Sequence, residues 1–301
     1  VAVRAVIEAG GEVVAESVEE IAEVAALAAE LERPARALLR LNPSERIHAF
    51  RLATGGPGSP FGIAEADLDE AVDALLLAAP WVRGEGIHVH RGSQNTSAAG
   101  FLRHASDVVR LARRAAARGL PVATINLGGG LGVLPGDGTR LDHEALGKGL
   151  RRLHREVEEA LPGVRFVLEP GRWLVAEEGT LLLRVQRVLR RDERVFVVVD
   201  GGFDCFLFAT EGHRFGPPHP VRNLSRSDAP PQRVTLVGPA CTPVDTLAAE
   251  IAIPEPRRGD LLALGHAGAY AAGASPRGFL GRRPAREVVL DSYEVTPPRV
   301  L

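Results

Sequence analysis

The sequence of 301 residues contains no methionine, a single lysine, two cysteines and only 5% aromatic residues. The two cysteines, Cys205 and Cys241, are too few for a disulfide framework. No apolar run reaches the roughly 18 residues of a membrane-spanning helix and no signal-peptide pattern opens the chain, so a cytoplasmic protein without membrane contact is expected. The absent initiator methionine predicts that the chain begins inside a longer protein or at a misassigned start.

The remaining composition is that of a globular protein. Apolar residues make up 45% of the chain, which is long enough for a large core or for a barrel with a second domain. The formal net charge of −2 gives no reason to expect a nucleic-acid partner. No metal site is predicted.

Five short apolar strands end in polar residues or glycines. They are predicted within residues 13–16, 37–42, 86–94, 124–130 and 165–172. Their ends carry a carboxylate, an arginine, a His/Ser pair, three glycines and an acid–base pair. Parallel α/β folds place their chemistry at the carboxyl ends of the strands, so the five ends predict the rim of an active site.

Helical patterns separate these strands and predict a parallel sheet with crossover helices. The helices are expected at residues 17–32, 67–79, 97–118 and 142–161, the first opened by the capping box of Ser17 and Glu20. After residue 172 the pattern becomes mostly β, with strands expected at 180–188, 195–199, 233–237, 260–264 and 287–290. The predicted domains are 1–178 and 179–301. A barrel of this class needs eight strands, so three βα modules are expected to be absent from the N-terminus. Five parallel strands cannot close a barrel, and their edge backbone groups are expected to be unpaired.

The polar residues at the strand ends suit a phosphorylated pyridine ring. Gly128, Gly129 and Gly130 let backbone N–H groups approach a phosphate, although a flexible loop is the alternative interpretation. The loop is no dinucleotide fingerprint, because Val133 replaces the third glycine. Ser93 and Arg172 could add phosphate contacts, Glu169 could pair with a protonated ring nitrogen, and His90 could stack on the ring. A lone strand histidine is more often a core residue, so the prediction depends on the whole set.

Six motifs, in order, resemble those of the fold-type III pyridoxal-phosphate decarboxylases, the diaminopimelate and ornithine decarboxylase family. They are His90-Arg-Gly92-Ser93, Gly128-Gly129-Gly130, Glu169-Pro-Gly-Arg172, Asp200-Gly201-Gly202, Gly238-Pro239-Ala240-Cys241 with Asp245, and Gly268-Ala269-Tyr270. The resemblance runs nearly end to end. It implies a partial alanine-racemase-like (β/α)8 barrel followed by a C-terminal β-domain.

The resemblance also implies roles for these residues. His90 stacks on pyridoxal 5′-phosphate and Glu169 keeps its pyridine nitrogen protonated. Cys241 returns a proton to carbon from the other subunit of a homodimer. The remaining cofactor-binding residues are Arg40, Ser93, Gly128, Gly129, Gly130, Arg172 and Tyr270, and the substrate residues are Asp200, Thr242 and Asp245.

Two departures from the family pattern bear on activity. The lysine that forms the Schiff base has no counterpart here, because Lys148 lies in a predicted helix four residues after Glu144 and is simplest as a solvated ion pair. This chain is therefore expected to be inactive alone. In branches acting on diamino acids an acidic residue follows the cysteine, and here it is Thr242. Diamino substrates are therefore disfavoured.

The run after Cys241, with residues 274–280, resembles a branch associated with natural-product and exopolysaccharide clusters, one type of which decarboxylates a glutamyl group on an acyl-carrier protein. The basic residues Arg277, Arg282, Arg283 and Arg286 would suit an acidic carrier, or form an ordinary solvated surface. The predicted substrate is an amino acid or a carrier-bound aminoacyl group. Two alternatives stay open: a non-catalytic relative with a binding or regulatory role, and an amino-acid racemase.

Overall fold

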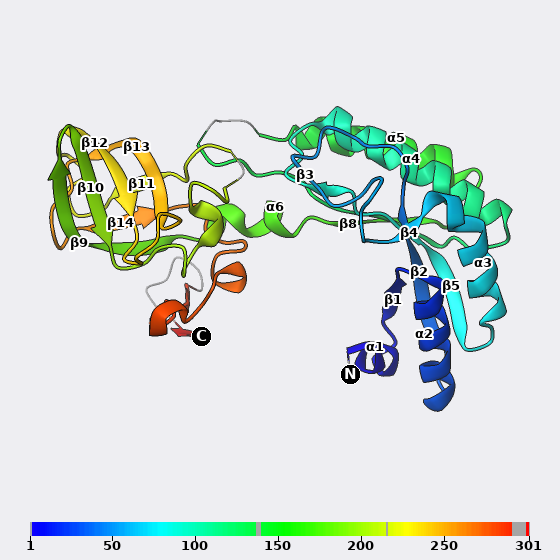
Figure 1. Cartoon of the computed structure of the whole chain (residues 1–301). Coiled ribbons are helices and arrows are strands. Elements are labelled where there is room, and N and C mark those ends of the chain that lie inside the picture. The colour runs from blue at the N-terminus through cyan, green and yellow to red at the C-terminus, as the bar shows by residue number, and fades with distance from the viewer. Residues whose placement is uncertain (1, 137–139, 215, 291–298, 301) are drawn as a thin grey trace. The chain divides into compact units, whose positions relative to one another are not determined.

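The computed structural model describes residues 2–136, 140–214, 216–290 and 299–300 (Figure 1). It contains two compact units. The first comprises Val1–Val133 and Thr139–Gly171, and the second comprises Leu134–Gly138 and Arg172–Leu301. The division after Gly171 precedes the boundary near residue 178 that the sequence predicts.

A five-stranded parallel sheet forms the centre of the first unit. Its strand order is β1 (Glu12–Ala15), β2 (Ala35–Asn42), β5 (Val82–His88), β7 (Thr124–Gly129) and β8 (Arg165–Glu169). The five expected barrel strands are therefore confirmed, and β1 and β8 are the edges of the described sheet. Short β4 (Ile63–Ala64) adds to the end of β2, and β3 (Leu52–Ala53) pairs antiparallel with β6 (Gly92–Ser93).

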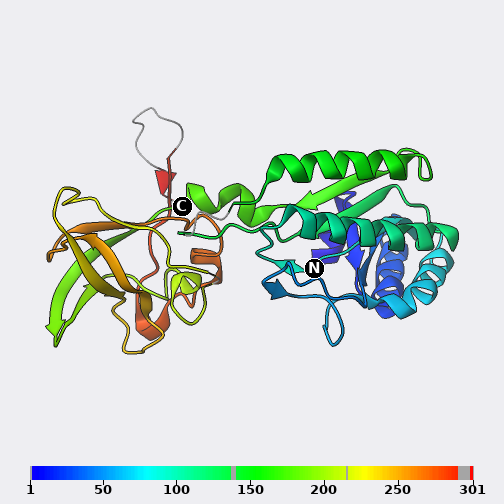
Figure 2. The ribbon, with the colours of Figure 1, turned by 90° about the horizontal axis from the view of Figure 1, so that it is seen from above.

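Helices cover one face of this sheet, and local capping fixes where three of them begin. They are α1 (Ala2–Glu8), α2 (Val18–Glu30), α3 (Leu68–Leu77, after a 3₁₀ turn at Glu65–Asp67), α4 (Ala98–Ala117) and α5 (His143–Glu158). Ser17, Ser97 and Asp142 each accept a bond from the backbone N–H three residues later. Helix α1 was not expected from the sequence. Figure 2 shows α4 and α5 side by side.

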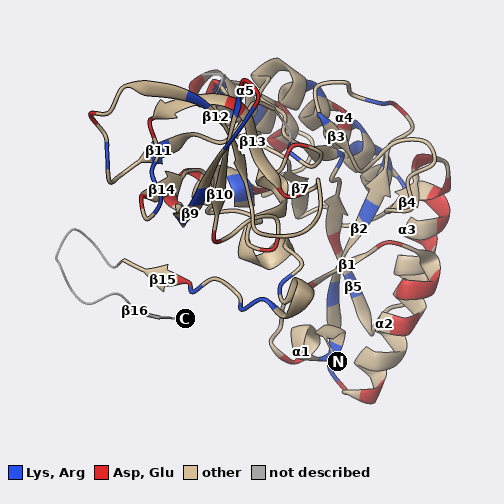
Figure 3. Ribbon diagram, turned by 60° about the vertical axis from the view of Figure 1, so that its left-hand side comes forward, with Lys and Arg blue, Asp and Glu red and all other residues tan. Residues whose placement is uncertain are grey.

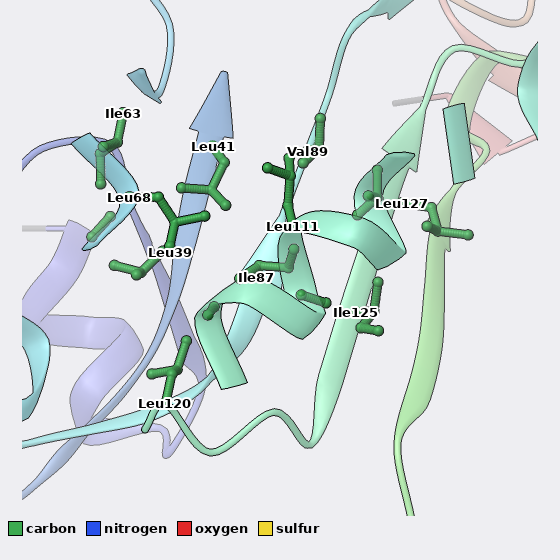
Figure 4. Close-up of a cluster of buried hydrophobic side chains, with 14 of the residues drawn as sticks. Leu39, Leu41, Ile63, Leu68, Ile87, Val89, Leu111, Leu120, Ile125 and Leu127 are labelled. Carbon is green, nitrogen blue, oxygen red and sulfur yellow. The ribbon is translucent and has the colours of Figure 1, made fainter. Parts of the chain in front are cut away.

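The hydrophobic core of this unit lies between the sheet and the helices. Alternate strand residues point into it because side chains of a strand alternate between its faces. Figure 4 shows strand and helix side chains packed together there, among them Leu39, Leu41, Ile87, Val89, Leu111, Ile125 and Leu127. The strand residues between them, including Arg40, His88 and Asn126, therefore face the opposite side of the sheet.

Acidic residues concentrate on α2 and α3 (Figure 3). Two of those on α3 bind arginines near the end of α4: Asp69 pairs with Arg114 at 3.0 Å and Asp73 binds Arg118. These pairs are partly or largely exposed, so they add little to stability and mainly fix how the two helices sit together.

The second unit is built on a six-stranded sheet. Its order is β11 (Val221–Asn223), β14 (Leu261–Leu264), β9 (Leu181–Arg191), β10 (Arg194–Val199), β12 (Pro231–Val237) and β13 (Thr246–Pro254), with only β10 and β12 parallel among these neighbours. Strands β11 and β13 were not expected. In β13 the alanines and the glutamate give little β-propensity. The short helix α6 (Gly171–Val175) and a 3₁₀ turn at Ala176–Glu178 precede β9.

The remaining elements of the second unit are short. They are 3₁₀ turns at Leu207–Ala209, Ala272–Ala274 and Phe279–Gly281, and the pair β15 (Val288–Val289) and β16 (Arg299–Val300). The strand expected at residues 287–290 is thus present as β15. Among the described residues, none of the helices has the length and apolar character needed to cross a membrane.

Candidate active site

The strand register of the first unit aligns polar residues along the carboxyl end of the sheet. Arg40 of β2 lies opposite His88 of β5, and His88 lies opposite Asn126 of β7. A one-residue bulge at Glu85 sets this register, since Ala37 pairs with Gly84 but the next residue pairs with Gly86. The bulge decides which residues of β5 face the site.

At the β1 end of the row, Glu16 holds Arg40. The Glu16 carboxylate binds Arg40 Nη1 and accepts a bond from the Gly62 N–H at 2.9 Å. The Arg40 guanidinium also lies over the Phe61 ring, 5.2 Å from its centre. Arg40 is among the site residues predicted from the sequence, whereas Glu16 is not, although a carboxylate is expected at this strand end.

Glu169 ends β8 and is held by two neighbouring strands. Its Oε1 accepts a bond from Asn126 Nδ2 at 2.9 Å and lies 3.5 Å from His88 Nε2. The bond from His88 lowers the pKa of Glu169 to about 2, with further help from Asn126 and the nearby histidines, against the opposing effect of burial. Glu169 is therefore an anion throughout the neutral range. Its Oε2 has no hydrogen bond within the described part of the chain.

His90 contacts the glycine loop directly. Its Nδ1 accepts the Gly129 N–H at 3.1 Å, so a neutral His90 carries its hydrogen on Nε2. Burial, with the nearby His88 and Arg40 charges, lowers the pKa of His90, although Glu169 opposes this. The imidazole is therefore neutral near pH 7, as a ring that stacks on a flat heterocycle can be.

The three loop glycines differ in what their N–H groups do. Gly128 donates to Asn126 Oδ1 at 2.9 Å and Gly129 donates to His90, and both glycines are buried. Gly130 is partly exposed, and a Cβ built on it would lie 2.0 Å from the Gly92 carbonyl oxygen. The loop thus needs glycine for close backbone packing as well as for any phosphate.

The segment after Ser93 ties the two predicted phosphate loops together. Gln94 is buried, has a φ of +60°, and its Oε1 accepts the Val133 N–H at 3.0 Å. Asn95 adds backbone bonds to Gly130 and Gly132. A buried non-glycine residue with positive φ is a strained conformation typical of functional sites. The position of Gln94 directly after Ser93 is the one sequence signal that could have pointed to Gln94.

In the second unit, Arg172 and Tyr270 contact each other. The Arg172 guanidinium carbon lies 4.4 Å from the centre of the Tyr270 ring. Burial lowers the pKa of Arg172, and its Nε has no hydrogen-bond partner among the described residues. Both residues were expected at the phosphate, and their stacking fits a shared role.

The turn that carries Cys241 is held by Asp245. The two Asp245 carboxylate oxygens accept the N–H groups of Phe203 and Ala240, each at 2.7 Å. Through these two bonds Asp245 joins two turns of the chain, and it is 2% exposed. The substrate contact expected for Asp245 stays a prediction. Cys241 is exposed and Thr242 is partly exposed on the same turn.

Other charged residues of this unit are partly engaged. Asp200 accepts the Arg184 N–H at 2.7 Å. Of the four arginines considered for a carrier, Arg277 pairs with Glu287 and Arg282 with Asp204. Arg283 and Arg286 are exposed. The basic stretch is thus in part an intramolecular ion-pair network.

The only lysine of the chain lies outside the row of site residues. Lys148 is on α5, its side chain is 72% exposed, and its Nζ lies 3.6 Å from Glu144. Incubation with stoichiometric pyridoxal 5′-phosphate and borohydride is therefore expected to leave Lys148 without a covalent adduct. Peptide mass spectrometry checks this, with Lys148→Ala as the control. A stable adduct that disappears in Lys148→Ala would contradict the expectation.

The residues present fit a pyridoxal-phosphate-type ligand held without a covalent bond. The first unit offers an anionic carboxylate with one open oxygen, a neutral imidazole and a glycine loop at the carboxyl end of the sheet. Three more residues lie at this end and are absent from the residues predicted from the sequence: His88, Asn126 and Glu16. The period-2 alternation of strand side chains is the signal that could have found them, since His88 and His90 share one face.

Comparison with known proteins identifies the family of the chain. Residues 2–176 match the family described as pyridoxal-dependent decarboxylase, pyridoxal binding domain. The L-glutamyl-[BtrI acyl-carrier protein] decarboxylase of Niallia circulans is 32% identical over 298 residues, covering 94% of this chain and 68% of that protein. A diaminopimelate decarboxylase of Actinosynnema pretiosum subsp. auranticum is 38% identical over 296 residues, covering 91% and 62%.

A solved structure is also similar. Diaminopimelate decarboxylase from Helicobacter pylori, complexed with L-lysine, matches with a TM-score of 0.85 and 25% identity, over 99% of this chain and 72% of that one. The chain thus spans about two thirds of the length of the curated relatives it matches. On these matches the chain belongs to the fold-type III pyridoxal-phosphate-dependent decarboxylases, in the diaminopimelate decarboxylase family.

Proposed function

We propose that this chain binds pyridoxal 5′-phosphate and serves in the decarboxylation of an amino acid or of an aminoacyl group on a carrier protein. The observation that carries the proposal is the arrangement at the carboxyl end of one parallel sheet, where Asn126 and His88 hold Glu169 and the glycine loop holds His90. A ligand whose ring nitrogen is cationic and whose faces are aromatic suits both groups. When bound, the cofactor supplies the electron sink for loss of carbon dioxide.

The chain's own residues would orient the cofactor and return a proton to the substrate carbon. Glu169 Oε2 holds the proton of the ring nitrogen and His90 lies against the ring. Ser93 and Gly130 are the phosphate donors of the first unit, because the N–H groups of Gly128 and Gly129 already have acceptors. In the second unit, Arg172 and Tyr270 are proposed as phosphate-binding residues on the resemblance to the family, and their contact with each other supports this.

Proton return is proposed for the Cys241 thiol. Cys241 is exposed, as a group that acts on a ligand from a neighbouring subunit must be. We propose a homodimer with shared active sites on the resemblance to the family. Thr242 offers no charge to a distal amine, which supports a substrate other than a diamino acid.

The test starts with ligand binding by the chain itself. Pyridoxamine 5′-phosphate, which needs no lysine, is expected to bind, and its fluorescence measures the affinity. Carbon dioxide release is then measured on the protein as its organism makes it, with meso-diaminopimelate, L-ornithine, L-glutamate and a glutamyl acyl-carrier protein.

We expect turnover of a glutamyl or other non-diamino substrate, and some gain of diamino substrate in Thr242→Glu. Release from none of these compounds, with intact ligand binding, would instead favour the alternative of a non-catalytic relative. Racemisation without carbon dioxide release would favour the second alternative.

A further inference from the structure

Asn126 connects two parts of the site that lie in separate sequence motifs. It lies on β7 two residues before Gly128, it is 6% exposed, and the register places it beside His88. Its side chain bridges the glycine loop and the Glu169 carboxylate. None of the family motifs used above includes it.

The direction of the Asn126 amide is fixed by its partners. The Gly128 N–H donates at 2.9 Å, so the atom that receives it is the oxygen Oδ1. The nitrogen Nδ2 therefore faces Glu169 Oε1, 2.9 Å away. The Gly128 anchor has little room to shift, because a Cβ there would lie 2.6 Å from the Val89 carbonyl oxygen.

This contact leaves one Glu169 oxygen open. Oε1 receives Asn126 Nδ2 and lies near His88 Nε2, while Oε2 has no partner in the described residues. The Glu169 side chain is 47% exposed, so water alone would let the carboxylate turn. Asn126 gives the shorter of the two contacts that hold it, and the charged or titratable groups facing it are His88 and His90, at the end of β5.

We propose that Asn126 is a positioning residue that couples the glycine loop to Glu169 and turns Oε2 toward the ring nitrogen of the cofactor. The identity of the ligand in this inference rests on the proposed function. The effect of Asn126 on Glu169 does not rest on it, because the glycine loop, Asn126 and Glu169 are already connected in the unliganded chain.

The first measurement is the pKa of Glu169 in the unliganded chain, determined from a pH titration of its carboxyl ¹³C NMR signal. Asn126→Leu removes a hydrogen bond to a charged group, so the pKa of Glu169 is expected to rise by about 1–2 units. Asn126→Thr is the second variant: its hydroxyl can still accept from Gly128 but is too short to reach Glu169. The same rise is expected there.

The second measurement uses pyridoxamine 5′-phosphate labelled with ¹⁵N in its ring. Asn126→Leu is expected to weaken binding about tenfold to a hundredfold and to lower the pH at which the bound ring nitrogen loses its proton. In a Glu169→Gln background the same substitution should have little further effect, because Asn126 acts through Glu169.

The chain offers a matched control. Asn223, 2% exposed in the second unit, donates to Asp260 Oδ2 at 2.9 Å and accepts the Ser225 N–H two residues later at 3.0 Å. Asn223→Leu removes the same kind of bridge and should change neither measurement.

The outcomes separate the two proposals. A folded Asn126 variant with an unchanged pKa of Glu169 overturns the positioning role. If Asn126→Leu loses as much affinity in the Glu169→Gln background as in the original chain, the role is overturned too, since the loop alone would then explain the loss. A changed pKa of Glu169 in a chain that never binds pyridoxamine 5′-phosphate supports the positioning role and rejects the proposed cofactor.

Discussion

Gly130→Ala is expected to abolish binding of pyridoxamine 5′-phosphate and to lower the free energy of unfolding by several kcal/mol. The backbone φ of +93° disfavours alanine by about 1–3 kcal/mol. The added Cβ would lie 2.0 Å from the Gly92 carbonyl oxygen, and such overpacking adds typically about 1–3 kcal/mol. Relief of the clash would push apart the loops that carry Ser93 and Gly130. Denaturant unfolding and ligand fluorescence measure the two effects.

Gly163→Ala is the matched control for this change. Gly163 also has a positive φ, +78°, but a Cβ there would meet no atom within 4 Å. Gly163→Ala should lower the free energy of unfolding only by the contribution of the disfavoured backbone conformation, and it should leave ligand binding intact. Equal costs for the two variants, with binding retained in both, would show that close packing of the loop is unimportant.

Cys241→Ala, in the protein as its organism makes it, is expected to reduce turnover by about 10²–10⁴, the range for loss of a positioned acid. Cofactor binding should stay nearly intact, because no phosphate contact is removed. A larger share of turnovers should end in transfer of the amino group, since the proton then reaches the wrong carbon. Steady-state release of carbon dioxide and analysis of the carbonyl product check both points.

Cys205→Ala is the control, since it removes the other thiol of the chain. Burial raises the pKa of Cys205, and its Sγ lies 3.6 Å from Asp204 Oδ1, so it is a packing residue held in its neutral form. Its replacement should affect stability more than turnover. If Cys241→Ala keeps the original rate and product, Cys241 has no part in proton transfer.

Most of the first unit could be predicted from local patterns. The cap at Ser17, the approximate helix bounds and the five apolar strands depend on residues close in the chain, and the structure confirms them. Of the predicted capping box, the bond from the Glu20 N–H to Ser17 forms, whereas the Glu20 carboxylate accepts the Glu16 N–H instead of that of Ser17. In the second unit, β13 could not be predicted in this way. Its alanines and glutamate favour a strand only because β12 pairs with it along nearly its whole length.

The sequence alone was enough to place His90, the glycine loop and Glu169 at strand ends of the first unit, because each belongs to a short motif that follows an apolar run. Only the tertiary structure decided how they are connected. The bulge at Glu85 sets the register that brings His88 beside Asn126, and the bond from Asn126 to Glu169 spans 43 residues of sequence. Local patterns do not encode such contacts, since the register between strands depends on how the whole sheet packs.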